Sequence, residues 1–285
     1  MVVAGMIAAV VIGMVLGTLG GGGSILTVPV LVYVVGLPAV QATAYSLFVV
    51  GLSAAVGAVG YVRAGHVNLR VAAIFAAPSL VAVFLTRRFV VPAIPDPVFS
   101  LGSMAVGKDA LIMTLFAVTM VLAALSMIRG CLRCRANAGS NRDSKPGGSQ
   151  PGGTREHGPS LPAVALEGLV VGTVTGLVGA GGGFLIIPAL VLIGGLGMKE
   201  AVGTSLVIIT VKSLIGFLGD VGAATSIDWA FLLPFTAMTA LGIIVGMIAT
   251  RHVESARLRP VFGWFVLGMG ALITIQEVLV TTTLG

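Results

Sequence analysis

Charged side chains are scarce in this chain of 285 residues: lysine, arginine, aspartate and glutamate together make up only 9% of it. Soluble domains carry charge on about a quarter of their residues, so the composition excludes a water-soluble globular fold. Apolar residues make up 57%, and residues 2–19 contain no charged side chain. Because a bilayer-spanning helix needs roughly 20 mostly apolar residues, the sequence predicts an integral membrane protein surrounded by lipid.

Cysteine and histidine are also rare. The two cysteines, Cys131 and Cys134, form one isolated Cys-x-x-Cys pair, and the three histidines all lie between apolar segments. A single pair without a second pair of ligands is weak evidence for a metal site. We therefore expect no metal, no cofactor and no catalytic group of this kind.

Positive charge exceeds negative charge, giving a formal net charge of +6, but much of the excess lies between Arg129 and Arg155. A basic cluster between apolar segments is a signal of membrane topology, and we expect no nucleic-acid partner. The segment 129–160 is also rich in glycine, serine, proline and asparagine. Such a composition cannot bury enough apolar surface to offset its ordering entropy, so we interpret it as a flexible cytoplasmic linker.

Glycine is abundant, with 41 residues, and it marks an internal repeat. Residues 17–31, GTLGGGGSILTVPVL, align with residues 176–190, GLVGAGGGFLIIPAL. The same register, without a gap, pairs Gly36 with Gly195, Ala42 with Ala201, Ser46 with Ser205, Gly57 with Gly216 and Gly60 with Gly219. Apolar bias alone would not superimpose glycines, a proline and a serine. We interpret 1–128 as a first transmembrane repeat and 161–285 as a second.

Each repeat contains five apolar segments. In the first repeat they are Val2–Leu19, Ile25–Gly36, Ala39–Val62, Leu69–Leu85 and Ala110–Ile128; in the second they are Leu161–Val178, Phe184–Leu196, Ala201–Val221, Trp229–Ala249 and Val261–Val280. The second segment of each repeat is short: a dozen helical residues cover about 18 Å, against a hydrocarbon core of roughly 30 Å. We expect an all-α fold in which the first two segments of each repeat form a broken or re-entrant pair, hinged at the glycines, followed by three transmembrane helices.

A re-entrant pair returns to the side from which it started, so each repeat crosses the membrane an odd number of times. The two repeats are therefore expected to be inverted relative to each other. The positive-inside rule places the linker in the cytoplasm and both termini outside, in the inner (plasma) membrane of a cell. Arg87, Arg88 and Lys108 fall on the wrong side in this topology, and we expect them to snorkel at the interface.

The glycine runs are the first candidate site. A helix that breaks within the membrane leaves unpaired backbone groups, which only protein or a wet cavity can satisfy, and paired breaks in two repeats point to a transporter's binding site. The amides of helices starting after Gly23 and Gly183 would favour an anion. The candidate substrate-binding residues are Gly20, Gly21, Gly22, Gly23, Ser24, Gly179, Gly181, Gly182 and Gly183. The alternative is that these glycines only permit tight helix packing.

Hydroxyl groups form a second candidate cluster at the start of the third segment of each repeat. Thr43, Tyr45 and Ser46 in the first repeat are matched by Thr204 and Ser205 in the second. Their hydroxyls are candidates to donate hydrogen bonds to an oxyanion. Serine and threonine also cap helices or bond back to the preceding turn, and the sequence leaves both interpretations open.

Lys212 falls near the middle of the third segment of the second repeat, where the first repeat has Ser53. An ammonium at the centre of a membrane helix costs roughly 2.5 to 3.5 kcal/mol on insertion scales, so it is a functional hypothesis by default. We expect Lys212 either to supply positive charge to the substrate or to pair with Asp220, two turns further along the same helix.

The two motifs GGGGSILTVP (20–29) and GAGGGFLIIP (179–188), each followed by a segment that opens like AVGTSL (201–206), resemble the sulfite exporter TauE/SafE family. The resemblance covers nearly the whole chain outside the linker. It implies transport of sulfite, sulfonates, thiosulfate or other small organic anions, mainly across bacterial inner membranes.

These observations together predict a secondary transporter of small anions that works by alternating access around a site at the membrane midplane. Protons are a candidate coupling ion, and a homo-oligomer is left open. A membrane-embedded enzyme and a passive anion channel are the alternatives. The sequence contains no His-Glu-x-x-His motif and no matched pair of aspartates, so we do not expect an enzyme.

Overall fold

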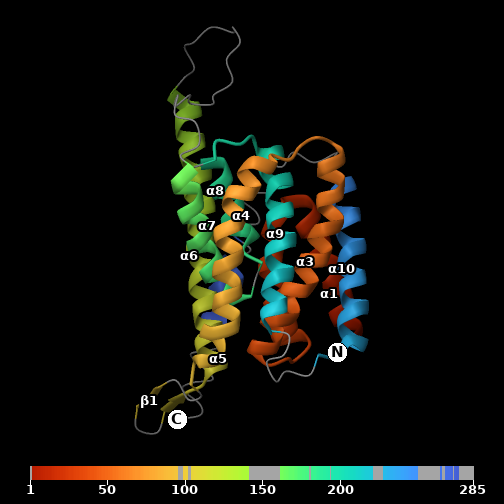
Figure 1. Ribbon diagram of the computed structural model, residues 1–285, viewed down its shortest axis with the longest axis vertical. Coiled ribbons are helices and arrows are strands. Elements are labelled where there is room, and N and C mark those ends of the chain that lie inside the picture. Colours follow the sequence, from red (N-terminus) through yellow and green to blue (C-terminus); the bar gives the residue numbers. More distant parts are fainter. Residues whose placement is uncertain are drawn as a thin grey trace.

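The computed structural model shows a bundle of helices, with a small hairpin beyond one end (Figure 1). The residues it describes are 2–95, 99–101, 104–140, 161–179, 181–192, 194–220, 227–249, 264, 267–271 and 273–275.

The first repeat begins with α1 (Val2–Leu19), followed by the 3₁₀ helix η1 (Gly20–Leu26), α2 (Thr27–Pro29) and the π-helical turn η2 (Val30–Val34). Two long helices follow, α3 (Ala39–Arg63) and α4 (Leu69–Leu85), and α4 continues through η3 (Thr86–Val90) and α5 (Val91–Ala93). The strands β1 (Phe99–Leu101) and β2 (Met104–Val106) pair antiparallel before α6 (Lys108–Ser140).

The second repeat consists of α7 (Leu161–Val178), α8 (Gly183–Leu192), α9 (Met198–Asp220) and α10 (Trp229–Ala249). Of the last predicted segment, 261–280, the described residues 264, 267–271 and 273–275 are helical. The structure confirms that four stretches are long and apolar enough to cross a membrane: Ala39–Arg63, Leu69–Ala93, Lys199–Asp220 and Trp229–Ala249. Shorter apolar helices accompany them.

The bundle itself is helical, as predicted, and a small antiparallel hairpin lies between α4 and α6. The sequence between its strands is Gly-Ser, a typical hairpin turn. One boundary differs from the prediction, because α6 continues through residues 129–140, the first part of the predicted flexible linker. Arginine, leucine and alanine in this stretch favour helix, and extending a formed helix requires no new nucleation. The rest of the linker lies outside the described residues.

The helices pack in a reciprocal pattern between the repeats. The first helix of each repeat lies against the fourth helix of the other, α1 on α10 and α7 on α4, while the third helices α3 and α9 lie side by side (Figure 1). Small residues bring the backbones close: Gly13 meets the backbone of Thr239 and Gly242, and Gly172 meets that of Ser79. This is the packing expected where lipid removes the hydrophobic driving force between helices.

The directions of neighbouring helices follow from the same contacts. Gly51 lies against Leu214 and Gly57 against Leu206, so α3 and α9 run antiparallel. Along α1 and α10, by contrast, Gly13 meets Gly242 and the later Gly17 meets Gly246, so this pair runs parallel.

Two groups of buried apolar side chains fill the bundle. One surrounds Ile12, Phe116 and Phe235, and the other surrounds Phe75 and Leu206. Large apolar side chains also cover much of the outside, including Ile7, Val81, Leu122, Leu166, Leu218 and Leu241. An apolar outer surface of this kind is what contact with lipid tails requires.

Candidate functional site

The chain reverses direction at glycines in both repeats. In the first repeat the break is a single residue, Gly20, with a φ of 66°. The chain then returns along α1, since Gly23 packs on the backbone of Leu16, and a Cβ placed on Gly5 would lie 3.3 Å from Val35 Cγ2. The chain therefore doubles back along α1, which is the geometry expected of the predicted re-entrant pair.

The run Gly20–Gly23 was expected to unwind and to be followed by a new helix. It is instead wound as the 3₁₀ helix η1, which leads directly into α2 and η2, so the helix that follows the break begins at Gly20 and not after Gly23. In a 3₁₀ helix the side chains of residues three apart eclipse one another, and residues without a Cβ avoid that crowding.

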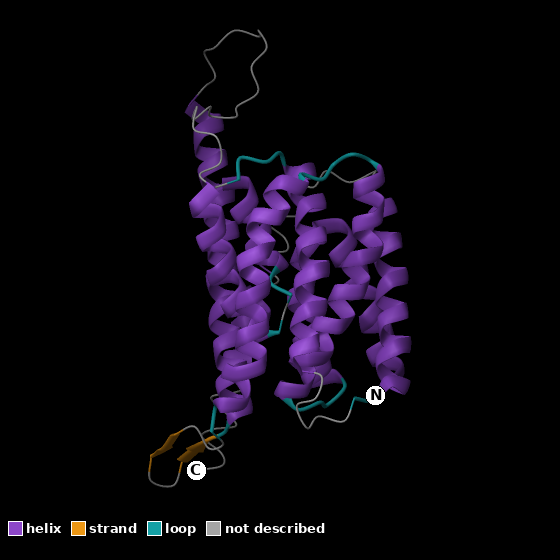
Figure 2. Ribbon diagram, in the orientation of Figure 1, coloured by secondary structure: helices purple, strands orange, loops and turns teal. Residues whose placement is uncertain are grey.

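In the second repeat the break is wider. Gly179, Gly181 and Gly182 all have positive φ values, between 64° and 74°, and regular helix resumes at Gly183, as predicted. Figure 2 shows this non-helical stretch inside the bundle, away from both ends.

The two breaks meet in the interior. A Cβ atom on Gly21 would overlap the backbone of Gly183, and a Cβ atom on Gly183 would overlap the backbone of Gly21. Both glycines are buried. Glycine is required at these two positions because the two backbones approach within the space that a side chain would occupy.

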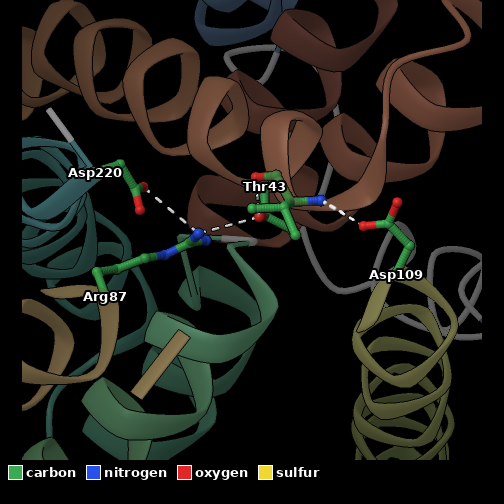
Figure 3. Close-up of polar contacts among 5 residues, drawn as sticks. Thr43, Arg87, Asp109 and Asp220 are labelled. Carbon is green, nitrogen blue, oxygen red and sulfur yellow. Dashed lines mark hydrogen bonds and ion pairs between the residues drawn. The ribbon is translucent and has the colours of Figure 1, made fainter. Parts of the chain in front are cut away.

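Arg87, drawn with Thr43 and Asp220 in Figure 3, lies against Gly179 at the beginning of the second break. Its Nη1 donates a hydrogen bond to Thr43 Oγ1 at 3.1 Å and lies 3.5 Å from Asp220 Oδ2. Its Nη2 lies 2.6 Å from the position that a Cβ atom on Gly179 would occupy. The side chain is only 1% exposed, so the guanidinium is held inside the protein by an ion pair, a hydroxyl and a glycine.

The burial of Arg87 corrects the expectation that it snorkels at the interface. Two local features direct it inward. It sits in the π-helical turn η3, which shifts the side-chain direction relative to a regular helix, and it packs on Gly219, where a Cβ atom would lie 3.0 Å from Arg87 Cβ. Arg88, the next residue, is exposed as expected.

Lys212 lies against the end of the same break. Its Nζ donates a hydrogen bond to Thr175 Oγ1 at 3.2 Å and lies 2.7 Å from the Cβ position of Gly182. The side chain is completely buried. Asp220 pairs with Arg87 and, among the described residues, forms no ion pair with Lys212, so the proposed pairing of Asp220 with Lys212 is wrong.

Hydroxyl groups lie around the middle of the break. Ser213 Oγ is 3.4 Å, and Ser24 Cβ 3.5 Å, from the Cβ position of Gly181. Ser24 donates to the carbonyl of Gly21 at 2.7 Å, whereas Ser213 Oγ is buried without a hydrogen-bond partner. Ser46 Oγ is likewise buried and unpartnered.

The other predicted hydroxyls have structural partners. Tyr45 accepts a hydrogen bond from the Asp228 amide at 2.6 Å and Thr204 accepts one from the Asn68 amide at 3.0 Å. Ser205 donates to the carbonyl of Val202 at 2.8 Å. These hydrogen bonds hold loops and helix turns, which is the alternative role that the sequence left open. The structure does not bring these three hydroxyls to the glycine breaks.

Among the described residues, the two buried cations lie at the second break. Gly179 faces Thr43 and Arg87, while its counterpart Gly20 faces Val202 and Ile187. In the repeat register, Thr43 corresponds to Val202, Thr175 to Leu16, Lys212 to Ser53 and Ser213 to Ala54. The site is therefore one-sided, although the two repeats share their packing.

This arrangement suits a small anion. Arg87 Nε and Nη2 are buried without a hydrogen-bond partner, and an unpartnered buried donor costs about 1–3 kcal/mol, more when it is charged. Guanidinium groups bind oxyanions through paired N–H donors, and an ammonium and a hydroxyl lie further along the same break. Among the described residues there is no group of three histidine, cysteine, aspartate or glutamate side chains that could hold a metal ion.

Buried cations beside non-helical backbone, in a bundle with several membrane-crossing helices, define a multi-pass membrane protein of the transporter class. The chain belongs to the sulfite exporter TauE/SafE family, which it matches over residues 5–273. It is 31% identical over 261 residues to a probable membrane transporter protein of Xylella fastidiosa strain 9a5c, covering 90% of this chain and 89% of the relative. A probable membrane transporter protein of Methanocaldococcus jannaschii is 32% identical over 119 residues, which is 38% of this chain and 42% of that protein. No solved structure matches the chain.

Proposed function

We propose that this protein is a secondary transporter of small anions, with sulfite, sulfonates and thiosulfate as the first candidates. The observation that carries the proposal is the placement of two buried cations, Arg87 and Lys212, at the two ends of one glycine break. A buried charge without full compensation is strongly unfavourable, and a bound anion would supply that compensation.

The direction of the helices supports an inverted repeat. The third helix of one repeat, α3, runs antiparallel to its counterpart α9. In an inverted repeat, two equivalent halves can rock against each other around a site at their interface, which is the basis of alternating access. The close approach of Gly21 of one repeat to Gly183 of the other supports hinges at that interface.

Charge supports one orientation. Three exposed cations lie at one end of the bundle, where α3 ends and α4 and α9 begin (Figure 1). They are Arg63 at the end of α3, Arg70 at the start of α4 and Lys199 at the start of α9. By the positive-inside rule that end faces the cytoplasm, together with the linker. The opposite end, where α9 finishes at Asp220, then faces outside, with both termini.

The test is transport into liposomes that contain the purified protein, using sulfite, thiosulfate, a sulfonate and a carboxylate. Arg87→Ala and Lys212→Ala are each expected to lower the initial rate by about tenfold or more, equivalent to ~1.4 kcal/mol. Lys199→Ala is the matched control, because Lys199 is an exposed cation on the same helix as Lys212, and it is expected to keep the wild-type rate.

The same assay separates the alternatives. A carrier saturates with substrate concentration, whereas a channel does not, and an enzyme would change the chemical identity of the anion. If the wild-type protein moves none of these anions, or if both cation variants retain full flux, the proposal is wrong.

A further inference from the structure

We propose that Asp220 is a tethered counter-anion that competes with the transported anion for Arg87, and that it takes up a proton when a doubly charged anion displaces it. This inference rests on the proposed function and adds a coupling rule to it. One proton would accompany each dianion, and none would accompany a monoanion.

The Arg87–Asp220 pair is incomplete. Its N–O distance of 3.5 Å exceeds the roughly 2.7–2.9 Å of a charge-assisted hydrogen bond. Asp220 Oδ2 has no hydrogen-bond donor, and Arg87 Nε and Nη2 have no acceptor. A closed bidentate pair would leave no room for exchange, whereas this geometry leaves the guanidinium able to receive a second oxyanion.

Asp220 also has a route to water. Its side chain is 12% exposed, while that of Arg87 is fully buried. It is the last residue of α9 and lies eight residues beyond Lys212, which corresponds to about 12 Å along the helix. A proton can therefore reach the carboxyl group from the aqueous phase while the guanidinium remains inside the protein.

The charge count gives the coupling rule. Two cations, Arg87 and Lys212, and one anion, Asp220, leave one net positive charge at the site. A monoanion neutralises that charge. A dianion leaves one uncompensated negative charge, which would be costly to bury, unless the displaced carboxylate of Asp220 binds one proton.

The neighbouring charged groups do not take over this role. Arg88 contributes its backbone amide beside Gly219, but its side chain is exposed. Asp109 of α6 is bound to the amide of Val40 at 3.2 Å, at the start of α3 (Figure 3). Lys212 is two turns away on the same helix and bonds to Thr175. Among the described residues, Asp220 is the carboxylate in contact with a cation of the site.

Proteoliposomes loaded with a pH-sensitive dye test the rule. Thiosulfate is the dianionic probe and methanesulfonate the monoanionic probe. The wild-type protein is expected to acidify the lumen by one proton per thiosulfate taken up, and not with methanesulfonate. Asp220→Asn is expected to abolish the acidification and to lower the KM for methanesulfonate by about tenfold, the change that removal of one competing contact worth ~1.4 kcal/mol would give.

Glu200→Gln is the matched control, because Glu200 lies in the first turn of the same helix, and it is expected to behave as the wild type. Asp220→Glu keeps a carboxylate and is expected to retain proton movement, which covers the case in which Asp220→Asn fails to fold. Proton uptake with both anions, or with neither, in the wild type overturns the coupling rule. So does undiminished proton uptake in Asp220→Asn. Either outcome leaves the transport proposal standing, because anion flux is measured separately.

Discussion

Gly179 and Gly195 share a backbone conformation but differ in their surroundings. Their φ values are 74° and 64°, a region where a residue with a Cβ costs about 1–2 kcal/mol. A Cβ atom on Gly179 would also collide with Thr43 and displace the guanidinium of Arg87, whereas at Gly195 it would meet nothing within 4 Å.

Alanine at these two positions therefore separates strain from site disruption. Both variants are expected to lose some stability, but only Gly179→Ala should reduce anion flux, by about tenfold or more. Transport rates measured at equal amounts of folded protein check this. Equal losses of flux in the two variants would show that backbone strain, and not the contact with Arg87, matters at Gly179.

At this scale the sequence drew attention to Lys212 as a candidate, but it did not predict that Arg87 is buried as well. Lys212 stands out in the sequence because it is a charged residue in the middle of an apolar segment, far from either end. Arg87 follows a complete apolar segment directly, so it reads as an ordinary interfacial residue. The one sequence signal was that Arg87 and Arg88 lie on the side that the positive-inside rule disfavours; the π-helical turn that buries Arg87 left no pattern in the sequence.

Helix packing depends on which glycines face another backbone. A Cβ atom on Gly13 would collide with the carbonyl of Thr239 on α10, while one on Gly60 of α3 would make only ordinary contact with Met247, at 3.6 Å or more. Gly13→Ala is expected to destabilise the protein by about 1–3 kcal/mol through overpacking. Gly60→Ala should be neutral or slightly stabilising, because alanine favours helix.

Thermal unfolding in detergent, followed by size-exclusion chromatography of heated samples, measures this difference. The expected order of melting temperature is Gly13→Ala below wild type, with Gly60→Ala equal to or above it. The packing interpretation would be abandoned if the two variants melted together.

A reciprocal pair of hydrogen bonds joins the repeats at opposite ends. Tyr45 at the start of α3 accepts from the amide of Asp228 before α10, and Thr204 at the start of α9 accepts from the amide of Asn68 before α4. Tyr45→Phe and Thr204→Val each leave a backbone donor without its acceptor. A loss of about 1–3 kcal/mol is expected for each variant.

Thr210→Val is the control for these two substitutions. Thr210 also lies on α9, but its hydroxyl donates to the carbonyl of Leu206 within the same helix, so its removal is expected to change the melting temperature little. If Thr210→Val lowers the melting temperature as much as Thr204→Val does, the hydrogen bonds between the repeats stabilise the protein no more than a bond within one helix.

Among the elements, the helix boundaries were the most predictable feature. The segments Val2–Leu19, Leu69–Leu85, Leu161–Val178 and Trp229–Ala249 coincide with observed helices, because each is an apolar run with at most one charged residue that ends at glycine or at polar residues. The conformation of the glycine run Gly20–Gly23 was not predictable in the same way. Glycine permits both an unwound chain and a 3₁₀ helix, and the choice depends on packing against α1.

At the scale of the whole molecule, the two repeats share their helix packing, and they differ in the polar residues of the candidate site. Both repeats contain a re-entrant or broken pair, and their hinges touch at Gly21 and Gly183. The polar residues at the second break do not follow the repeat: Thr175 and Lys212 of the second repeat have Leu16 and Ser53 as counterparts. In the proposed transporter, a symmetric frame would support two alternative conformations of similar energy, and a one-sided set of charges would give the anion a single position.

This frame makes a definite prediction about sidedness. Single cysteines at Ala64, Gly197 and Pro95, introduced after Cys131→Ser and Cys134→Ser, all lie at exposed positions. Ala64 follows α3 and Gly197 precedes α9, so in an inverted repeat both should react with a membrane-impermeant thiol reagent from the cytoplasmic side, as the positive-inside rule predicts. Pro95, beyond α5 at the opposite end of the bundle (Figure 1), should react from the outside. Labelling of Ala64→Cys and Gly197→Cys from opposite sides would mean that α3 and α9 cross the membrane in the same direction, and two repeats of one orientation could not exchange roles around a shared site.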